Sequence, residues 1–242
     1  MIAFLTSSPC VINAPRAILN PENGFLDNLR SCLPDHPRCL FVCSDPDSYG
    51  LTENFARDFD AAFREADLEF TEYAILDGRN RNSAQLLIWR SDLIILMGGH
   101  VPTQNRFFQE IGLRELLENY QGVVLGISAG SMNSAERVYM QPEESGESVP
   151  EFQRFAPGLG ITDVNMLPHY QQVRDYMLDG KRLFEDVTYV DSMGECFFAC
   201  VDGTYLLVEE GITTMYGEAY RIQDGICEQI SESGDIVMFE EY

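Results

Sequence analysis

The sequence predicts an α/β fold: a mostly parallel sheet with helices on both faces, followed by β-rich C-terminal hairpins. The first observation is that strand-like and helix-like segments alternate up to about residue 136, and that the strands are nearly continuous apolar runs. Such runs are typical of parallel strands buried on both faces. The second observation is a series of short strands and turns after residue 196. We expect one domain over residues 1–242.

Five short apolar segments bounded by turn residues predict the parallel strands. They cover residues 1–7, 38–46, 68–76, 91–99 and 122–128. Two of the apolar runs end in glycine, at Gly98 and Gly126. Because ligands of such sheets bind beyond the carboxyl ends of the strands, the residues after these two runs are the first candidates for a site.

Helical periodicity fills the intervals between these strands. The predicted helices cover residues 20–33, 49–66, 82–90 and 104–120. In the second of them Phe55, Phe59 and Phe63 recur on one face, which indicates an amphipathic helix. Pro21 and nearby acids mark the start of the first helix, and Asn82 or Ser83 suits the N-cap of the third.

The chain changes character after residue 140. Residues 140–158 are polar and rich in Glu, Pro and Ser, and they predict a loop. Residues 159–170 predict a strand that leads to His169, and residues 173–187 are expected to be helical in parts. The β series covers 196–230 and 235–239. It is divided by pairs typical of hairpin turns, namely Asp202-Gly203, Glu210-Gly211 and Asp224-Gly225.

Charge limits the classes of partner. The formal net charge is −23, which repels nucleic acids and anionic membrane surfaces, so we expect neither as a partner. Residues 185–242 hold 14 acidic residues against Arg221 alone. This segment is expected to form a solvated acidic face, and the alternative is a field that steers cationic substrates. No apolar run approaches the ~20 residues of a membrane span.

The cysteine and lysine content narrows the chemistry. The seven cysteines and the absence of an export signal are consistent with reduced thiols in a cytoplasmic protein. No cluster of Cys and His completes a zinc site, and no metal or cofactor is expected. Lys181 is the only lysine and lies far from any Ser-x-x-Lys pattern, which disfavours a Ser-Lys dyad or Schiff-base chemistry.

Residues 126–130, Gly-Ile-Ser-Ala-Gly, match the G-x-S-x-G pattern of a nucleophile elbow. The pattern requires a strand before it and a helix after it, and the sequence predicts both. Ser128 is therefore the candidate nucleophile; the alternative is a serine in a tight loop that binds an anion or nothing. Ala129 opens the following helix, so its free N–H is a candidate oxyanion donor, together with Gly98 or Gly99.

The general base must be one of three histidines. His36 lies before a strand, at the opposite edge of the sheet. His100 follows Gly99 at the correct edge, where it suits substrate contact as well as catalysis. His169 ends the strand at 159–170 and is the preferred base. The acid that orients it is expected in the loop after the nucleophile, whose glutamates are Glu136, Glu143, Glu144 and Glu147.

Four segments together resemble the peptidase E and cyanophycinase group, serine peptidase family S51. They are "DLIILMGG", "GVVLGISAGS", "GLGITDVNMLPHY" and "YGEAYRIQDG". The resemblance covers residues ~1–230 and implies a fold like the class I glutamine amidotransferases, with serine in place of their nucleophilic cysteine.

Carried over by position, the resemblance makes Ser128 the nucleophile, His169 the base and Gly99 and Ala129 the oxyanion donors. The acid, fifteen residues after the serine, lands on Glu143, with Glu144 as the alternative. Peptidase E has Asn where this chain has His100, which puts strict Asp-X specificity in doubt. The candidates for binding a substrate Asp are the cations near in sequence, His100, Arg106 and Arg137.

The sequence thus predicts a cytoplasmic serine peptidase that cleaves small peptides, with Asp-X dipeptides as one candidate substrate and a homodimer as a candidate assembly. The alternatives are a cyanophycinase-like hydrolase, an esterase, and an inactive binding protein on the same scaffold. An α/β-hydrolase esterase usually has its histidine near the chain end. Here only 41 residues separate Ser128 from His169 and no later histidine follows.

Overall fold

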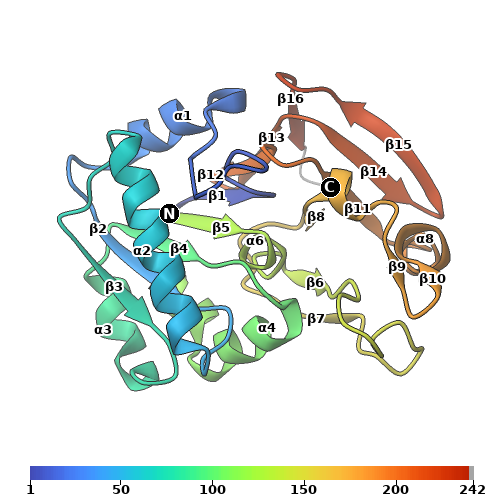
Figure 1. The fold of residues 1–242 in the computed structure, drawn as a ribbon, viewed down its shortest axis with the longest axis horizontal. Coiled ribbons are helices and arrows are strands. Elements are labelled where there is room, and N and C mark those ends of the chain that lie inside the picture. Colours follow the sequence, from blue (N-terminus) through green and yellow to red (C-terminus); the bar gives the residue numbers. More distant parts are fainter. Residues whose placement is uncertain (240–242) are drawn as a thin grey trace.

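The computed structural model describes residues 1–239; residues 240–242, the end of the domain expected over residues 1–242, lie outside the described part. A central eight-stranded sheet has the order β16-β13-β12-β1-β5-β4-β2-β3 (Figure 1). Five neighbouring strands of this sheet are parallel: β1 (Ile2–Thr6), β5 (Val123–Ile127), β4 (Leu93–Leu96), β2 (Arg38–Val42) and β3 (Glu72–Leu76). They confirm the five strands predicted from the apolar runs.

The remaining three strands extend the sheet in antiparallel fashion. They are β12 (Tyr205–Glu209), β13 (Ile212–Tyr216) and β16 (Ile236–Phe239). β1 therefore lies between a parallel and an antiparallel neighbour, with Thr6 opposite both Ile127 of β5 and Tyr205 of β12. This register brings the residues that follow β1 next to those that follow β5.

Helices connect the parallel strands. They are α1 (Phe25–Cys32), α2 (Tyr49–Glu65), α3 (Ala84–Trp89), α4 (Val101–Glu110) and α5 (Leu113–Leu117), with 3₁₀ turns at Glu22–Gly24 and Arg81–Ser83. Right-handed crossovers put helices on opposite faces when the chain reverses direction along the sheet, as it does after β3. The single helix predicted over 104–120 is two helices, because Gly112 takes a left-handed φ of +63° between α4 and α5.

A second sheet, of order β15-β14-β11-β8, stands beside the first (Figure 1). Its strands are β8 (Asn165–Leu167), β11 (Cys196–Cys200), β14 (Ala219–Gln223) and β15 (Ile226–Ser231). β8 and β11 are parallel, with Leu167 opposite Ala199, whereas the other pairs are antiparallel. The residues that follow β8 and β11 therefore emerge side by side.

Short elements complete the connections. The pairs are β6 (Arg137–Tyr139) with β7 (Phe155–Pro157) and β9 (Met177–Leu178) with β10 (Lys181–Arg182). The helices are α6 (Ala129–Met132), α7 (Tyr170–Val173), a π-helix (Leu183–Thr188) and α8 (Tyr189–Asp191). The predicted loop over 140–158 thus ends in a strand.

One predicted hairpin turn is wrong. Glu210-Gly211 joins the paired strands β12 and β13, and Asp224-Gly225 joins the paired strands β14 and β15. Asp202-Gly203, however, joins β11 of the second sheet to β12 of the central sheet, and these strands do not pair with each other. The composition of a turn does not show whether the next strand returns to the same sheet.

The apolar core lies mainly around the central sheet, where the parallel strands β2, β4 and β5 are almost wholly buried. A second apolar cluster includes Met132, Tyr139 and Phe197, and the rings of Tyr139 and Phe197 stack at 4.2 Å. Within residues 1–239, the structure contains no helix with the length and apolar character needed to cross a membrane.

Candidate active site

Ser128 lies on a sharp turn between β5 and α6, with φ +51° and ψ −110°. This is a strained conformation for a residue with a side chain. Steric limits explain why glycine lies two residues before and two residues after Ser128. A Cβ at Gly130 would lie 2.3 Å from the Leu96 carbonyl oxygen of β4, and a Cβ at Gly126 would lie 2.9 Å from the Ser131 hydroxyl. The turn therefore has the form that the G-x-S-x-G pattern predicts.

Hydrogen bonds to β1 hold this turn in place. The Ser128 N–H donates to the Thr6 carbonyl at 3.0 Å, and the Ser131 hydroxyl donates to the same oxygen at 2.8 Å. The Thr6 hydroxyl in turn donates to the Gly126 carbonyl at 2.8 Å. Because Thr6 and Ser131 are buried, these bonds are shielded from water and fix the position of the Ser128 hydroxyl.

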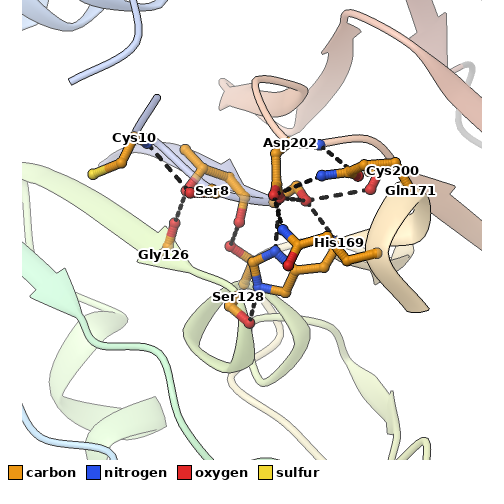
Figure 2. A network of polar contacts seen from close by, with 12 residues as sticks. Ser8, Cys10, Gly126, Ser128, His169, Gln171, Cys200 and Asp202 are labelled. Atoms are coloured by element: carbon orange, nitrogen blue, oxygen red, sulfur yellow. Dashed lines mark hydrogen bonds and ion pairs between the residues drawn. The ribbon is translucent and has the colours of Figure 1, made fainter. Parts of the chain in front are cut away.

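The imidazole of His169 lies between Ser128 and Asp202 (Figure 2). His169 Nε2 is 2.9 Å from Ser128 Oγ, and His169 Nδ1 is 2.7 Å from Asp202 Oδ1. His169 follows β8 with a left-handed φ of +59°, and Asp202 follows β11. The three residues have the geometry of a nucleophile, a base and an orienting acid.

Asp202 is buried and held by several hydrogen bonds besides the one to His169. Its side chain is 2% exposed and also accepts hydrogen bonds from the Ser7 hydroxyl at 2.8 Å and from the Gln171 and Gln172 amides at 2.7 and 2.6 Å. Burial raises the pKa of Asp202, but the hydrogen bonds from His169, Ser7 and Gln171 outweigh it and leave the pKa below its ordinary value. The carboxylate is therefore ionised at neutral pH.

The expectation that Glu143 orients His169 is corrected by these contacts, because His169 Nδ1 is paired with Asp202. Glu143 lines the cavity beside Ser128, and the residues after it make other contacts: Glu147 contacts His100, and Asp179 accepts hydrogen bonds from Ser145, Gly146 and Ser148. Asp202, Ser7, Gln171 and Gln172 are not among the residues predicted from the sequence. The one sequence signal for Asp202 is its position after a strand, and the pair Asp202-Gly203 is equally typical of a hairpin turn.

The two predicted oxyanion donors flank Ser128. Ala129 is the first residue of α6, so its N–H has no intrahelical acceptor. Gly99 follows β4 and lines the same cavity as Ser128. A Cβ at Gly99 would lie 2.4 Å from the Ser44 hydroxyl oxygen, so this close approach requires glycine. Gln104 supports the loop by donating to the Met97 carbonyl at 2.6 Å.

A cavity of about 280 Å³ opens beside the Ser128 hydroxyl. Its walls are Gly99, Ser128, Met132, Gln141, Pro142, Glu143, Pro168, His169, Val173, Tyr176 and Leu183. The volume is at the lower end of the range for ligand pockets, which suits a small substrate or one side chain of a larger one.

The three residues predicted as candidates for substrate binding, His100, Arg106 and Arg137, do not line this cavity. His100 donates or accepts through Nδ1 to the Thr103 hydroxyl at 2.8 Å, and its Nε2 is 2.8 Å from Glu147 Oε1. Arg106 lies exposed on α4. Arg137 pairs with Glu195 and covers the Phe155 ring at 3.9 Å. His36 lies before β2, as expected for a residue remote from the site.

One group of side chains has the composition of a metal site. Ligand atoms of His100, Glu144 and Glu147 lie within 4.8 Å of one another. The carboxylate of Glu147 is already used, because it also accepts the N–H groups of Glu143 and Glu144 at 2.9 and 3.0 Å. These contacts link the backbone of Glu143 and Glu144 to His100, which directly follows Gly99.

Two solved structures have similar folds. One is a peptidase from an acI-B1 actinobacterium, with a TM-score of 0.63, 17% identity, and coverage of 98% of this chain and 96% of that one. The other is a peptidase E protein from Listeria monocytogenes EGD-e, with a TM-score of 0.58, 15% identity, and coverage of 95% and 98%. No curated protein matches the chain.

The family comparison extends over most of the chain. Residues 20–214 match the family model of peptidase family S51, a range that contains Ser128, His169 and Asp202. The fold agrees with that of the two solved peptidases. The chain belongs to peptidase family S51 and is a serine-type peptidase.

Proposed function

We propose that the protein hydrolyses peptide bonds of small peptides with Ser128 as nucleophile, His169 as general base and Asp202 as orienting acid. The observation that carries the proposal is the continuous contact from Ser128 Oγ through His169 to the buried Asp202 carboxylate. An inactive binding protein would have no need of a strained serine with this set of partners.

The contacts support the following sequence of steps. Ser128 Oγ attacks the substrate carbonyl carbon while His169 Nε2 takes the hydroxyl proton. Asp202 holds the imidazole tautomer that carries its proton on Nδ1 and stabilises the imidazolium that forms. The N–H groups of Gly99 and Ala129 donate to the oxyanion. His169 then gives its proton to the leaving amine, and a water molecule hydrolyses the acyl-enzyme by the same route.

The cavity gives less support to Asp-X specificity. Among residues 1–239, neither arginine nor lysine lines it, and the one carboxyl in its wall is that of Glu143. An aspartate side chain in this cavity would meet a carboxyl group instead of a cation. We therefore keep hydrolysis of small peptides as the proposed activity and consider the preferred side chain separately.

The test combines labelling with variant kinetics. We expect a fluorophosphonate to label wild-type Ser128 and to leave Ser128→Ala unlabelled. Asp202→Asn should lower the kcat of peptide hydrolysis on the order of 10³–10⁴-fold, because it favours the wrong tautomer of His169. Glu144→Gln, which removes another of the predicted acids, is the control and should retain activity.

Three outcomes would argue against the proposal. If folded wild-type protein gave no adduct at Ser128, the binding-protein alternative would be favoured. If 4-nitrophenyl esters turned over and no peptide in a dipeptide library did, an esterase would be favoured. A larger loss in Glu143→Gln than in Asp202→Asn would restore Glu143 as the orienting acid.

A further inference from the structure

Among the described residues, the wall of the cavity beside Ser128 holds one carboxyl, that of Glu143, and its other polar residues are Ser128, His169, Gln141 and Tyr176. Met132, Val173 and Leu183 supply apolar surface, and Gln141 is the neutral polar neighbour of Glu143 in the lining. Within the described part of the chain, the Glu143 carboxyl forms no ion pair. A side chain that enters this cavity from the reacting carbonyl therefore passes apolar surface and meets one unpaired carboxyl.

The position of Glu143 is set by a chain of contacts that begins at the oxyanion loop. Glu147 Oε2 accepts the Glu143 N–H at 2.9 Å, and Glu147 Oε1 is 2.8 Å from His100 Nε2. His100 directly follows Gly99. The segment that supplies Gly99 thus also fixes the backbone of Glu143. The position of Glu143 relative to the oxyanion donor Gly99 is therefore held by these contacts.

The electrostatic surroundings of Glu143 favour a cation. Glu143 is an exposed residue, but packing at the cavity wall desolvates its carboxyl enough to raise its pKa to about 8, and the negative charges of Glu147 and Glu144 add to this effect. His169 and Tyr176 are the titratable groups in the other walls of the cavity. A bound ammonium or guanidinium group would favour the ionised carboxylate, whereas a bound carboxylate would add to the repulsion.

We propose that the cavity receives the side chain of the residue on the acyl side of the scissile bond, and that Glu143 selects lysine or arginine there. The inference rests on the proposed function, since it takes Ser128 as the nucleophile. It names Glu143 as a specificity-determining residue and reverses the charge preference expected for an Asp-X peptidase. The long stems of lysine and arginine fit the apolar wall, and their charged ends reach the carboxyl.

The experiment uses N-acetylated diphenyl phosphonates of lysine, norleucine and aspartate, which form adducts with a reactive serine. Norleucine matches the lysine stem without its charge. The rate of adduct formation at Ser128 is followed by intact mass. We expect lysine to react roughly tenfold faster than norleucine, the size of one charge-assisted hydrogen bond, and aspartate to react slowest.

Variants and pH make the test specific to Glu143. In Glu143→Gln the lysine-to-norleucine ratio should fall to about one, whereas Glu144→Gln should keep it. In wild type the ratio should rise from pH 7 to pH 9, because Glu143 ionises in this range while lysine stays protonated up to about pH 10. Glu144, Glu147, His169 and Tyr176 remain in Glu143→Gln, so a flat ratio in that variant assigns the change to Glu143.

The possible failures are distinguishable. If a fluorophosphonate labels Ser128 but lysine reacts no faster than norleucine, the serine hydrolase stands and the inference about Glu143 is overturned. The same holds if Glu143→Gln leaves the ratio unchanged, or if aspartate reacts fastest. If neither the fluorophosphonate nor any amino-acid phosphonate modifies Ser128, the proposed function fails, and this inference fails with it.

Discussion

Ser7 is a single buried hydroxyl that contacts two of the proposed catalytic residues. It donates to Asp202 Oδ1 at 2.8 Å and accepts the backbone N–H of His169 at 2.8 Å. It follows β1, whereas its partners follow β11 and β8. One small side chain therefore joins the central sheet to the second sheet at the point where the imidazole must be held.

Replacement of Ser7 tests this role. We expect Ser7→Ala to lower kcat roughly tenfold with little change in KM, since it removes the hydrogen bond to Asp202 and the one from the His169 N–H without touching the substrate. Steady-state kinetics on a cleaved peptide measure both constants. A rise in KM at unchanged kcat would instead indicate a role in substrate binding.

At the scale of elements, the turn between β5 and α6 depends on close contact between α6 and β4. Gly130 permits this contact, because a side chain there would meet the Leu96 backbone. Buried backbone cannot move aside as the end of a flexible side chain can. The short helix α6 is therefore placed by steric fit to the sheet more than by its own length of four residues.

Gly130→Ala should lower the free energy of unfolding by about 1–3 kcal/mol, because the added methyl group overpacks the contact with β4. It should also slow the labelling of Ser128, which lies two residues away. Gly50→Ala is the matched control: it lies on α2 with open space around the added Cβ and should be neutral or slightly stabilising. Chemical denaturation of both variants measures the difference.

At the scale of the whole molecule, excess negative charge opposes folding at neutral pH. The net charge is −23 and the isoelectric point calculated from the sequence is about 4.3. Protonation of part of the 39 carboxyl groups reduces this repulsion. An opposite effect comes from carboxyls whose pKa is lowered in the folded protein, among them Asp92, Asp186 and Asp202. The stability that these groups contribute is fully present above the ordinary carboxyl pKa, and it is lost as the pH falls through their pKa values in the folded protein.

The two effects together predict the highest Tm at mildly acidic pH, near pH 5, in low salt. In about 0.5 M NaCl the decline in Tm from pH 5 to pH 8 should flatten, because salt screens the repulsion between exposed charges. Thermal unfolding followed by circular dichroism over this range measures both. An equally steep decline in high salt would assign it to buried groups instead of surface charge.

Features that depend on neighbours in the sequence could be predicted from the sequence. The apolar runs specify the parallel strands, and Gly126 and Gly130 specify a tight turn at Ser128, because steric limits on the backbone act over a few residues. The position of His169 at the end of a strand could also be predicted, because it depends on the residues next to it in the sequence. The prediction of one helix over 104–120 failed only where Gly112 interrupts it.

Asp202, Ser7 and the charge of the cavity were decided by the tertiary structure. Asp202 approaches His169 because β11 runs parallel to β8 and the chain then crosses to the central sheet, and a turn of sequence Asp-Gly carries no information about that crossing. The sequence by itself determined which serine lies on a strained turn between a strand and a helix. Which carboxylate supports its histidine depended on contacts between segments more than 30 residues apart, and such pairing is set by how the sheets pack.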